Sequence, residues 1–197
     1  MEIVVIDYKA GNIRSVLFAL ERIGANGILT DDPQRILNAD KVIFPGVGEA
    51  SSAMEALRSR GLDKLIPTLK QPLLGICLGM QLLCSHSEEG NTNCLNVFPV
   101  QVKRFPEKRA GVEKVPHVGW NTVSGLKGAL FNDLPDPVYM YYVHSFYAEQ
   151  SAFTTGVSRH IIDYSASLQK DNFYAVQYHP EKSGDAGERL LRNFIAI

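Results

Sequence analysis

The stretch that most constrains the fold is Gly75-Ile76-Cys77-Leu78-Gly79, where an apolar run ends at a cysteine with a glycine two residues away on either side. The apolar residues before it predict a buried strand, and residues 80–83 favour a helix. Strand, sharp turn and helix together form a nucleophile elbow, in which glycines let neighbouring backbone pass close to a strained nucleophile. Cys77 would then lie at a helix N-terminus, which favours the thiolate, with the N–H of Leu78 as an oxyanion donor. A small buried cysteine without a catalytic role is the alternative.

The segments around this turn alternate between strand and helix patterns. Strands are expected at residues 2–7, 28–29, 41–44, 73–76 and 173–178, and helices at residues 12–23, 50–60, 62–69 and in the C-terminal segment capped by Ser183. This alternation predicts an α/β fold, a three-layer open sheet that is largely parallel and flanked by helices. Residues 96–104 and 138–146 predict antiparallel strands in the second half. We expect one domain over residues 1–197.

Charge and cysteine content exclude several classes. A net charge of -1 gives no general attraction for nucleic acid or acidic membranes. No apolar stretch reaches the length of a membrane span, and the first residues resemble a strand more than a signal peptide, so a cytoplasmic protein is expected. Three cysteines without a C-x2-C pair favour free thiols in a reducing compartment over disulfides or a metal site. A single glycine after the first strand is too little for a dinucleotide fingerprint, so no cofactor is expected.

A cysteine nucleophile needs a base, and His179 is the strongest candidate. It is the only one of the five histidines that ends a strong strand pattern and is followed two residues later by a carboxylate, Glu181. Pro180 fixes a turn in which the carboxylate can orient the imidazole toward the thiol. A Cys77–His179–Glu181 triad would perform acyl transfer through a thioester. Pro45-Gly46-Val47-Gly48 follows another strand, and Val47 would supply the second oxyanion donor. The residues alone thus predict a cysteine hydrolase of an amide or ester.

These three motifs, in this order and spacing, resemble the class I (triad) glutamine amidotransferases along the whole chain. The resemblance implies that glutamine is hydrolysed to glutamate and ammonia. It also implies glutamine contacts for five residues, namely Gly46, Gly48, Gln81, His144 and Ser145.

Further motifs resemble one group within that class, the glutaminase subunits of imidazole glycerol phosphate synthases. They are Asp7-Tyr8-x-Ala10-Gly11-Asn12, Phe44-Pro45-Gly46-Val47-Gly48, His117-x-Gly119-Trp120-Asn121, Tyr142-Val143-His144-Ser145 and Gln169-Lys170-Asp171-Asn172-Phe173-Tyr174.

In that group, ammonia passes to a (β/α)8-barrel cyclase subunit, which makes imidazole glycerol phosphate and aminoimidazole carboxamide ribonucleotide in histidine biosynthesis. The resemblance therefore implies a heterodimer with such a cyclase, faced by Asn12, Trp120 and Lys182. Some features depart from the group: Lys9 stands where glycine is usual, Val118 and Tyr178 replace a more usual methionine and phenylalanine, and residues 153–166 fit poorly.

Three alternatives stay open at this point. A related amidotransferase subunit could feed another synthase, because the catalytic motif does not identify the acceptor. A cysteine peptidase or thiol-dependent chaperone could use the same elbow, but it would ignore free glutamine. A catalytically silent regulatory subunit is disfavoured, because it would have no need for Cys77, His179 and Glu181 together.

Overall fold

A large mixed sheet forms the centre of the molecule. The computed structural model describes residues 1–8, 13–106 and 114–197. In spatial order, the strands of the sheet are β2 (Gly27–Thr30), β1 (Ile3–Ile6), β3 (Lys41–Gly46), β4 (Leu73–Cys77), β13 (Phe173–Val176), β12 (Ile162–Lys170), β10 (Phe146–Ala148), β7 (Gln101–Arg104), β5 (His86–Ser87) and β6 (Thr92–Asn93), with β11 (Thr154–His160) paired to β12. The first five of these strands run parallel, and antiparallel pairing begins between β13 and β12.

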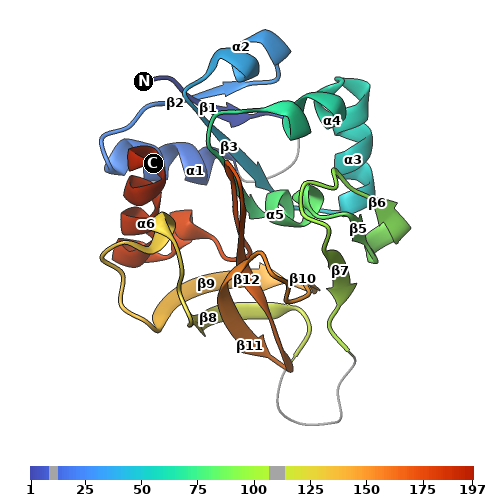
Figure 1. Cartoon of the computed structure of the whole chain (residues 1–197), viewed down its shortest axis with the longest axis vertical. Coiled ribbons are helices and arrows are strands. Elements are labelled where there is room, and N and C mark those ends of the chain that lie inside the picture. The colour runs from blue at the N-terminus through green and yellow to red at the C-terminus, as the bar shows by residue number, and fades with distance from the viewer. Residues whose placement is uncertain (9–12, 107–113) are drawn as a thin grey trace.

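Helices cover both faces of the parallel half (Figure 1). They are α1 (Ile13–Arg22), α2 (Pro33–Asn38), α3 (Ala50–Ser59), α4 (Leu62–Leu65), α5 (Leu78–Leu83) and α6 (Gly184–Ala196), with short 3-10 turns η1 (Ile66–Thr68), η2 (Glu89–Asn91), η3 (Ala129–Phe131) and η4 (Pro180–Lys182). One core lies under α2, α3, α4 and α5, and a second lies under α1 and α6. The expected three-layer α/β arrangement is therefore confirmed.

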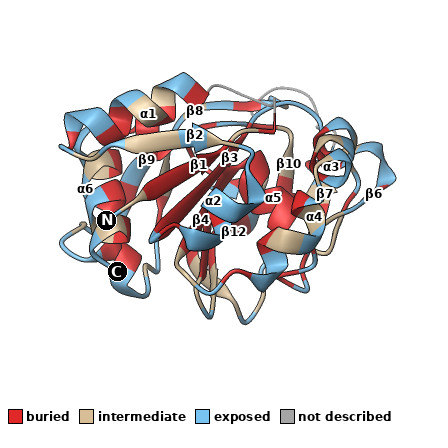
Figure 2. Ribbon diagram, turned by 90° about the horizontal axis from the view of Figure 1, so that it is seen from above, coloured by how far each residue is buried: buried red, intermediate tan, exposed pale blue. Residues whose placement is uncertain are grey.

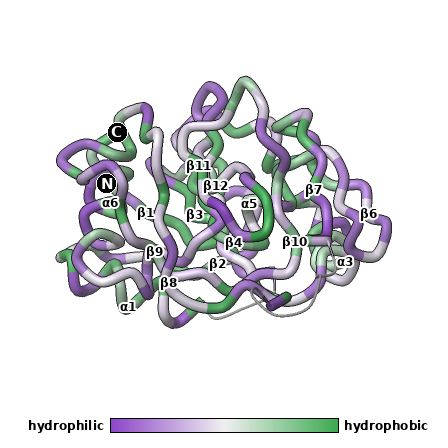
Figure 3. The backbone as a smooth tube through the Cα atoms, turned by 90° about the horizontal axis from the view of Figure 1, so that it is seen from below, coloured by the Kyte–Doolittle hydropathy of each residue, from purple (hydrophilic) through white to green (hydrophobic). Residues whose placement is uncertain are grey.

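The parallel strands are apolar because both of their faces are covered. Every residue of β1, β3, β4 and β13 is buried, whereas the covering helices keep exposed outer faces (Figure 2). Hydropathy follows the same division, with hydrophobic residues along the central strands and hydrophilic residues at many peripheral turns (Figure 3). Parallel strands buried on both faces show this continuous apolar pattern. No helix among the described residues is long and apolar enough to cross a membrane.

A separate two-stranded sheet covers the second core. It pairs β8 (His117–Val123) antiparallel with β9 (Val138–His144), and Met140 and Tyr142 turn inward. The sequence predicted one strand over residues 138–146, and this was wrong in one respect. The chain leaves β9 at Ser145 and continues as β10 in the large sheet. This break places the Ser145 backbone between the two sheets, at the edge of the site described below.

Other differences from the expected elements are local. The strand-like stretch expected within residues 96–104 is β7, while residues 96–100 form no strand and bond to the end of α5 and to neighbouring loops. The helix expected over residues 62–69 divides into α4 and η1, with Pro67 inside the second turn. Ser183 precedes α6 as expected, but its hydroxyl donates to the carbonyl of His179 instead of capping the helix.

Candidate active site

Cys77 lies at the corner between β4 and α5, as the sequence predicted. Its backbone has φ 54° and ψ −109°, which is strained for a residue with a Cβ. The two flanking glycines are explained by close packing. A Cβ at Gly79 would overlap the carbonyl oxygen of Phe44 on β3, and one at Gly75 would press on the backbone of Gly79. The strand and helix therefore approach closely enough only with glycine at both positions, and Cys77 is held at the turn between them.

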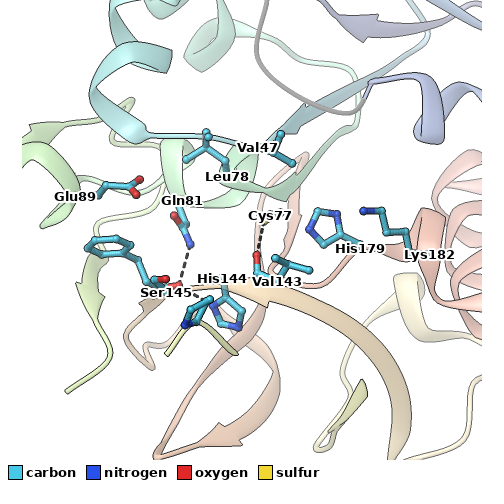
Figure 4. Close-up of a pocket in the computed structure, with 13 residues that line it drawn as sticks. Val47, Cys77, Leu78, Gln81, Glu89, Val143, His144, Ser145, His179 and Lys182 are labelled. Atoms are coloured by element: carbon cyan, nitrogen blue, oxygen red, sulfur yellow. Dashed lines mark hydrogen bonds between the residues drawn. The ribbon is translucent and has the colours of Figure 1, made fainter. Parts of the chain in front are cut away.

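His179 and Glu181 come together in the turn η4 at the end of β13. His179 Nδ1 lies 2.7 Å from Glu181 Oε1, and both side chains are buried. Because a carboxylate accepts, Nδ1 donates, and the other imidazole nitrogen is left for Cys77 (Figure 4). The pKa of His179 is raised to about 10: burial lowers it, but the negative charge of the Cys77 thiolate and the bonds to Cys77 and Glu181 raise it by more.

A cavity of about 280 Å³ opens beside Cys77. Its wall combines Val47 and Gly48 after β3, Leu78 and Gln81 of α5, the segment from Val143 to Phe146, and His179 with Lys182. The thiol of Cys77 lies 3.8 Å from the carbonyl oxygen of Val143, which gives a weak hydrogen bond. Elements that are far apart in the sequence thus surround the nucleophile on several sides (Figure 4).

The two predicted oxyanion donors both line this cavity. Leu78 is the first residue of α5, so its N–H has no partner within the helix and is left for a ligand. Val47 follows the end of β3 and is 38% exposed. Gly48, with φ 110°, has the backbone conformation that glycine tolerates best.

The predicted glutamine contacts divide into two groups. Gly48, Gln81, His144 and Ser145 all line the cavity. Gly46 does not: it pairs with Cys77 across β3 and β4, and a Cβ there would meet the hydroxyl of Tyr8. Gly46 therefore supports the neighbouring strand instead of the cavity wall.

Gln81 is more restrained than its sequence position suggested. Its amide nitrogen Nε2 donates to the carbonyl of Phe146 and to Oε1 of Gln177, each at 2.9 Å. Gln177 in turn donates to the sulfur of Cys77 at 3.7 Å. Because an amide nitrogen has two hydrogens, only the Oε1 atom of Gln81 is left to act on a ligand.

The predicted partner-facing residues lie in different places. Trp120 is 56% exposed on β8 and packs edge-on against Tyr141. The side chain of Lys182 lies beside His179 and lines the cavity (Figure 4). Asn12 lies outside the described residues.

Two further residues at this site had no role assigned from the sequence, although Tyr8 belongs to one of the motifs. Glu89 lines the cavity from η2, and its Oε2 accepts from the N–H of Ala50 at 2.8 Å. It lies in a polar stretch without periodicity, so only the fold brings it here. Tyr8 donates to the carbonyl of Pro45 at 2.9 Å and so fixes the start of the loop that carries Val47. Its position directly after the first strand was the available signal.

Within residues 1–8, 13–106 and 114–197, no group of three or more histidine, cysteine, aspartate or glutamate side chains is placed to hold a metal ion. The described site contains a cysteine at a strained turn, a histidine held by a carboxylate, backbone donors and a cavity. This set of groups is suited to nucleophilic acyl substitution.

Comparisons with known proteins agree with this chemistry. Residues 4–197 match the family model described as "Glutamine amidotransferase class-I". The chain is 54% identical to "Imidazole glycerol phosphate synthase subunit HisH" from Bacteroides thetaiotaomicron, and the match covers 100% of both proteins. A protein of the same name from Idiomarina loihiensis is 42% identical, with 100% of this chain and 98% of the relative covered.

The fold also resembles a solved glutamine amidotransferase from Thermotoga maritima. The TM-score is 0.62 at 18% identity, covering 100% of this chain and 83% of the other. At that identity the likeness concerns the fold alone.

Proposed function

This chain belongs to the class-I glutamine amidotransferase family, and from that premise we propose that it is the glutaminase subunit of an imidazole glycerol phosphate synthase. It hydrolyses L-glutamine to glutamate and ammonia and thereby serves histidine biosynthesis. The observation that carries the proposal is the strained Cys77 beside His179 and Glu181 at the wall of a cavity. Full-length relatives that share this chain's length and bear the synthase subunit's name support the pathway.

The first chemical step is attack by the Cys77 thiolate on the side-chain amide carbon of glutamine. A carbon–sulfur bond forms, and the carbonyl electrons move onto oxygen. The N–H groups of Val47 and Leu78 stabilise that oxyanion, and each such donor is worth roughly 3 kcal/mol in comparable sites. Because the elbow already holds Cys77 at the helix N-terminus, little reorganisation is needed when charge develops.

The second step transfers a proton from His179 to the leaving nitrogen. The carbon–nitrogen bond breaks, ammonia departs, and a thioester on Cys77 remains. His179 then takes a proton from water, which attacks the thioester and releases glutamate and the thiolate. Glu181 keeps the imidazole oriented through Nδ1 and stabilises its positive charge.

Recognition of the amino-acid end of glutamine is assigned to polar groups around the cavity. Of the described residues that line it, only Glu89 has a carboxylate, and this group can pair with the α-ammonium of glutamine. Burial raises the pKa of Glu89, and the charge of Glu49 adds to this, while the Ala50 N–H lowers it. An ammonium ligand would favour the ionised form. The free Oε1 of Gln81 is a second acceptor.

The partner we propose is the (β/α)8-barrel cyclase subunit, forming a heterodimer in the cytoplasm. An apolar surface supports this: Val118, Trp120 and Tyr139 are 57%, 56% and 62% exposed on the outer side of β8 and β9. Val143 belongs both to this exposed surface and to the cavity wall. Apolar groups gathered on one surface beside a cavity are typical of a docking site. Trp120, Lys182 and Asn12 are proposed to face the partner.

The test is glutamate release from L-glutamine by the purified chain, alone and with the barrel cyclase carrying its phosphoribosyl substrate. A large rise in the loaded mixture is expected. No rise, together with intact labelling of Cys77 by an electrophilic glutamine analogue, would retain glutamine chemistry but assign another acceptor. No glutamate release and no labelling would reject the proposal.

A further inference from the structure

Two buried histidines, His144 in the cavity wall and His117 behind it, have no role in the steps above. His117 begins β8 and His144 ends β9, and the two residues are directly opposite each other in the strand register. Their exposed fractions are only 6% and 5%. A buried polar side chain is costly unless its hydrogen bonds are satisfied, so their partners reveal what they hold in place.

The direction of each hydrogen bond in this series follows from its last acceptor, the carbonyl oxygen of Phe146. His144 Nδ1 lies 2.7 Å from the carbonyl oxygen of Phe146, which can only accept, so Nδ1 carries the hydrogen. His144 Nε2 is then an acceptor, and it lies 3.1 Å from His117 Nδ1 and 3.3 Å from the hydroxyl of Tyr164, which can also donate to it. His117 must therefore donate from Nδ1, which leaves its Nε2 to accept from Asn121 at 3.4 Å. Both imidazoles have one defined tautomer.

The amide of Asn121 is itself fixed. Its Oδ1 accepts from the N–H of Thr122 at 2.8 Å, and its Nδ2 donates to the carbonyl of Arg159 at 2.9 Å. The amide cannot be turned over without losing both bonds. The donor that faces His117 is therefore set by the backbone of β8 and β11.

The surroundings keep both imidazoles neutral. The pKa of His144 is lowered to about 3 and that of His117 to about 4. Burial is the main cause at both, and neighbouring histidines contribute in the same direction, while the bond to the Phe146 carbonyl raises the pKa of His144 in part. The titratable groups packed against the pair are His160, stacked on His117 with ring centroids 4.1 Å apart, and Tyr142 and Tyr164, with His179 acting on His144 through its charge. Aromatic rings, including that of Phe105, complete the enclosure.

The carbonyl of Phe146 connects this pair to the cavity. It accepts from His144 on one side and from Gln81 on the other. Gln81 continues through Gln177 to the sulfur of Cys77. One carbonyl group is thus held between the two histidines and the side chain that lines the glutamine pocket.

We propose that His117 and His144 are positioning residues for glutamine binding. As a neutral pair that donates in one direction, they fix the carbonyl of Phe146, and through it the side chain of Gln81 and the backbone at Ser145. The identity of the ligand rests on the function proposed above, whereas the hydrogen-bond directions of the two histidines follow from the geometry alone. Neither histidine touches the reacting atoms, so their effect falls on binding more than on the chemical step.

The kinetic test compares three variants of the full chain in complex with the cyclase. His117→Leu removes the donor to His144, whereas His117→Asn retains an N–H close to the position of Nδ1. His160→Phe is the matched control, because it preserves the stacked ring but lies outside the directed chain. We expect His117→Leu to raise KM for glutamine about tenfold with a smaller change in kcat, which is the size of one lost buried hydrogen bond. His117→Asn should recover most of this loss, and His160→Phe should change KM by no more than about twofold.

Equal rises in KM for His117→Leu and His160→Phe would overturn the proposal, because they would show only loosened packing. An unchanged KM in His117→Leu would overturn it as well. The second measurement needs no variant: nitrogen-15 spectra of the imidazoles in the unmodified protein at pH 7. Both His117 and His144 are expected to be neutral Nδ1–H tautomers. An imidazolium or an Nε2–H tautomer at His144 would overturn the proposal. If the unmodified complex releases no glutamate, the proposed function is rejected. The spectra still test the tautomers of His117 and His144 in that case.

Discussion

Histidines lie on two sides of the same cavity, and their environments give them opposite charges. On one side, His179 contacts a carboxylate and a thiolate, and its pKa is raised to about 10. On the other, His117 and His144 contact amide, carbonyl and aromatic groups, and burial lowers their pKa values to about 4 and 3. Burial acts in the same direction at all three residues, so the charged neighbours decide the outcome.

This difference separates two tasks. The charged side can hold and move a proton, because His179 lies between Cys77 and Glu181. The neutral side contains only groups that donate and accept in fixed directions, which suits it to hold backbone in place.

Cys77→Ala has the largest expected effect, because it removes both the nucleophile and the negative charge beside His179. Glutamate release should fall by at least about 10³-fold. The pKa of His179 should also fall, because burial would then be opposed by Glu181 alone. Imidazole titration by NMR measures this shift, with His117 as the internal control, because burial and His160 set the pKa of His117. Retained glutamine turnover would contradict the assignment of the nucleophile.

Glu181→Gln removes the carboxylate from the charged side and preserves the size of the side chain. We expect kcat to fall by roughly 10² to 10⁴-fold, because the imidazolium loses its charged partner and its defined tautomer. The matched control on the neutral side is His160→Phe, whose kcat should stay close to that of the unmodified chain. Similar losses of kcat in the two variants would remove the distinction between the two sides.

The pH dependence of stability should have opposite signs on the two sides. The pKa of His117 is lowered in the folded protein, so on acidification the unfolded protein binds a proton at this residue first. The stability that His117 contributes is therefore present above pH 6.5 and is lost as the pH falls toward 4. The raised pKa of His179 gives stability that is fully present below pH 6.5 and is lost as pH rises through about 10. For His117 the complete effect is on the order of 3 kcal/mol.

Urea unfolding between pH 7 and pH 4 measures this loss, and His117→Leu provides the comparison. The variant cannot take up that proton, so its free energy of unfolding should depend less steeply on pH than that of the unmodified chain. Identical slopes would show that His117 does not enter the folded state as a buried neutral group.

Tyr8→Phe tests a neutral donor on the charged side and should have the smallest effect. It removes the bond to the carbonyl of Pro45, which holds the loop before Val47. We expect the free energy of unfolding to fall by about 1 kcal/mol and kcat to fall severalfold, as the oxyanion donor becomes less well placed. An unchanged kcat would mean that the loop is held without this bond.

The two sides also differ in how far the sequence predicted them. The charged side was found because its residues are close in sequence or carry local signatures: His179 and Glu181 share one turn, and glycines flank Cys77. The parallel half of the fold was predicted for the same reason, since strands buried on both faces are continuously apolar.

The neutral side depends on long-range register, which has no local signal. His117 meets His144 only because β8 and β9 pair in one register, and Glu89 reaches the cavity only through the packing of η2. The strand predicted over residues 138–146 hid the break at Ser145, because both parts are equally rich in apolar and aromatic residues. Gly46 was taken from the motif as a ligand contact, whereas the fold places it beside Tyr8.

The most direct test of the central claim is labelling of the unmodified chain with an electrophilic glutamine analogue, followed by peptide mass spectrometry. The other two cysteines provide internal controls, because burial raises the pKa of Cys84 and, against the opposing charge of Arg58, raises that of Cys94 to about 11. The account predicts one adduct, on Cys77, and protection of Cys77 by excess L-glutamine. Labelling of Cys94 in its place, or no protection by glutamine, would contradict it.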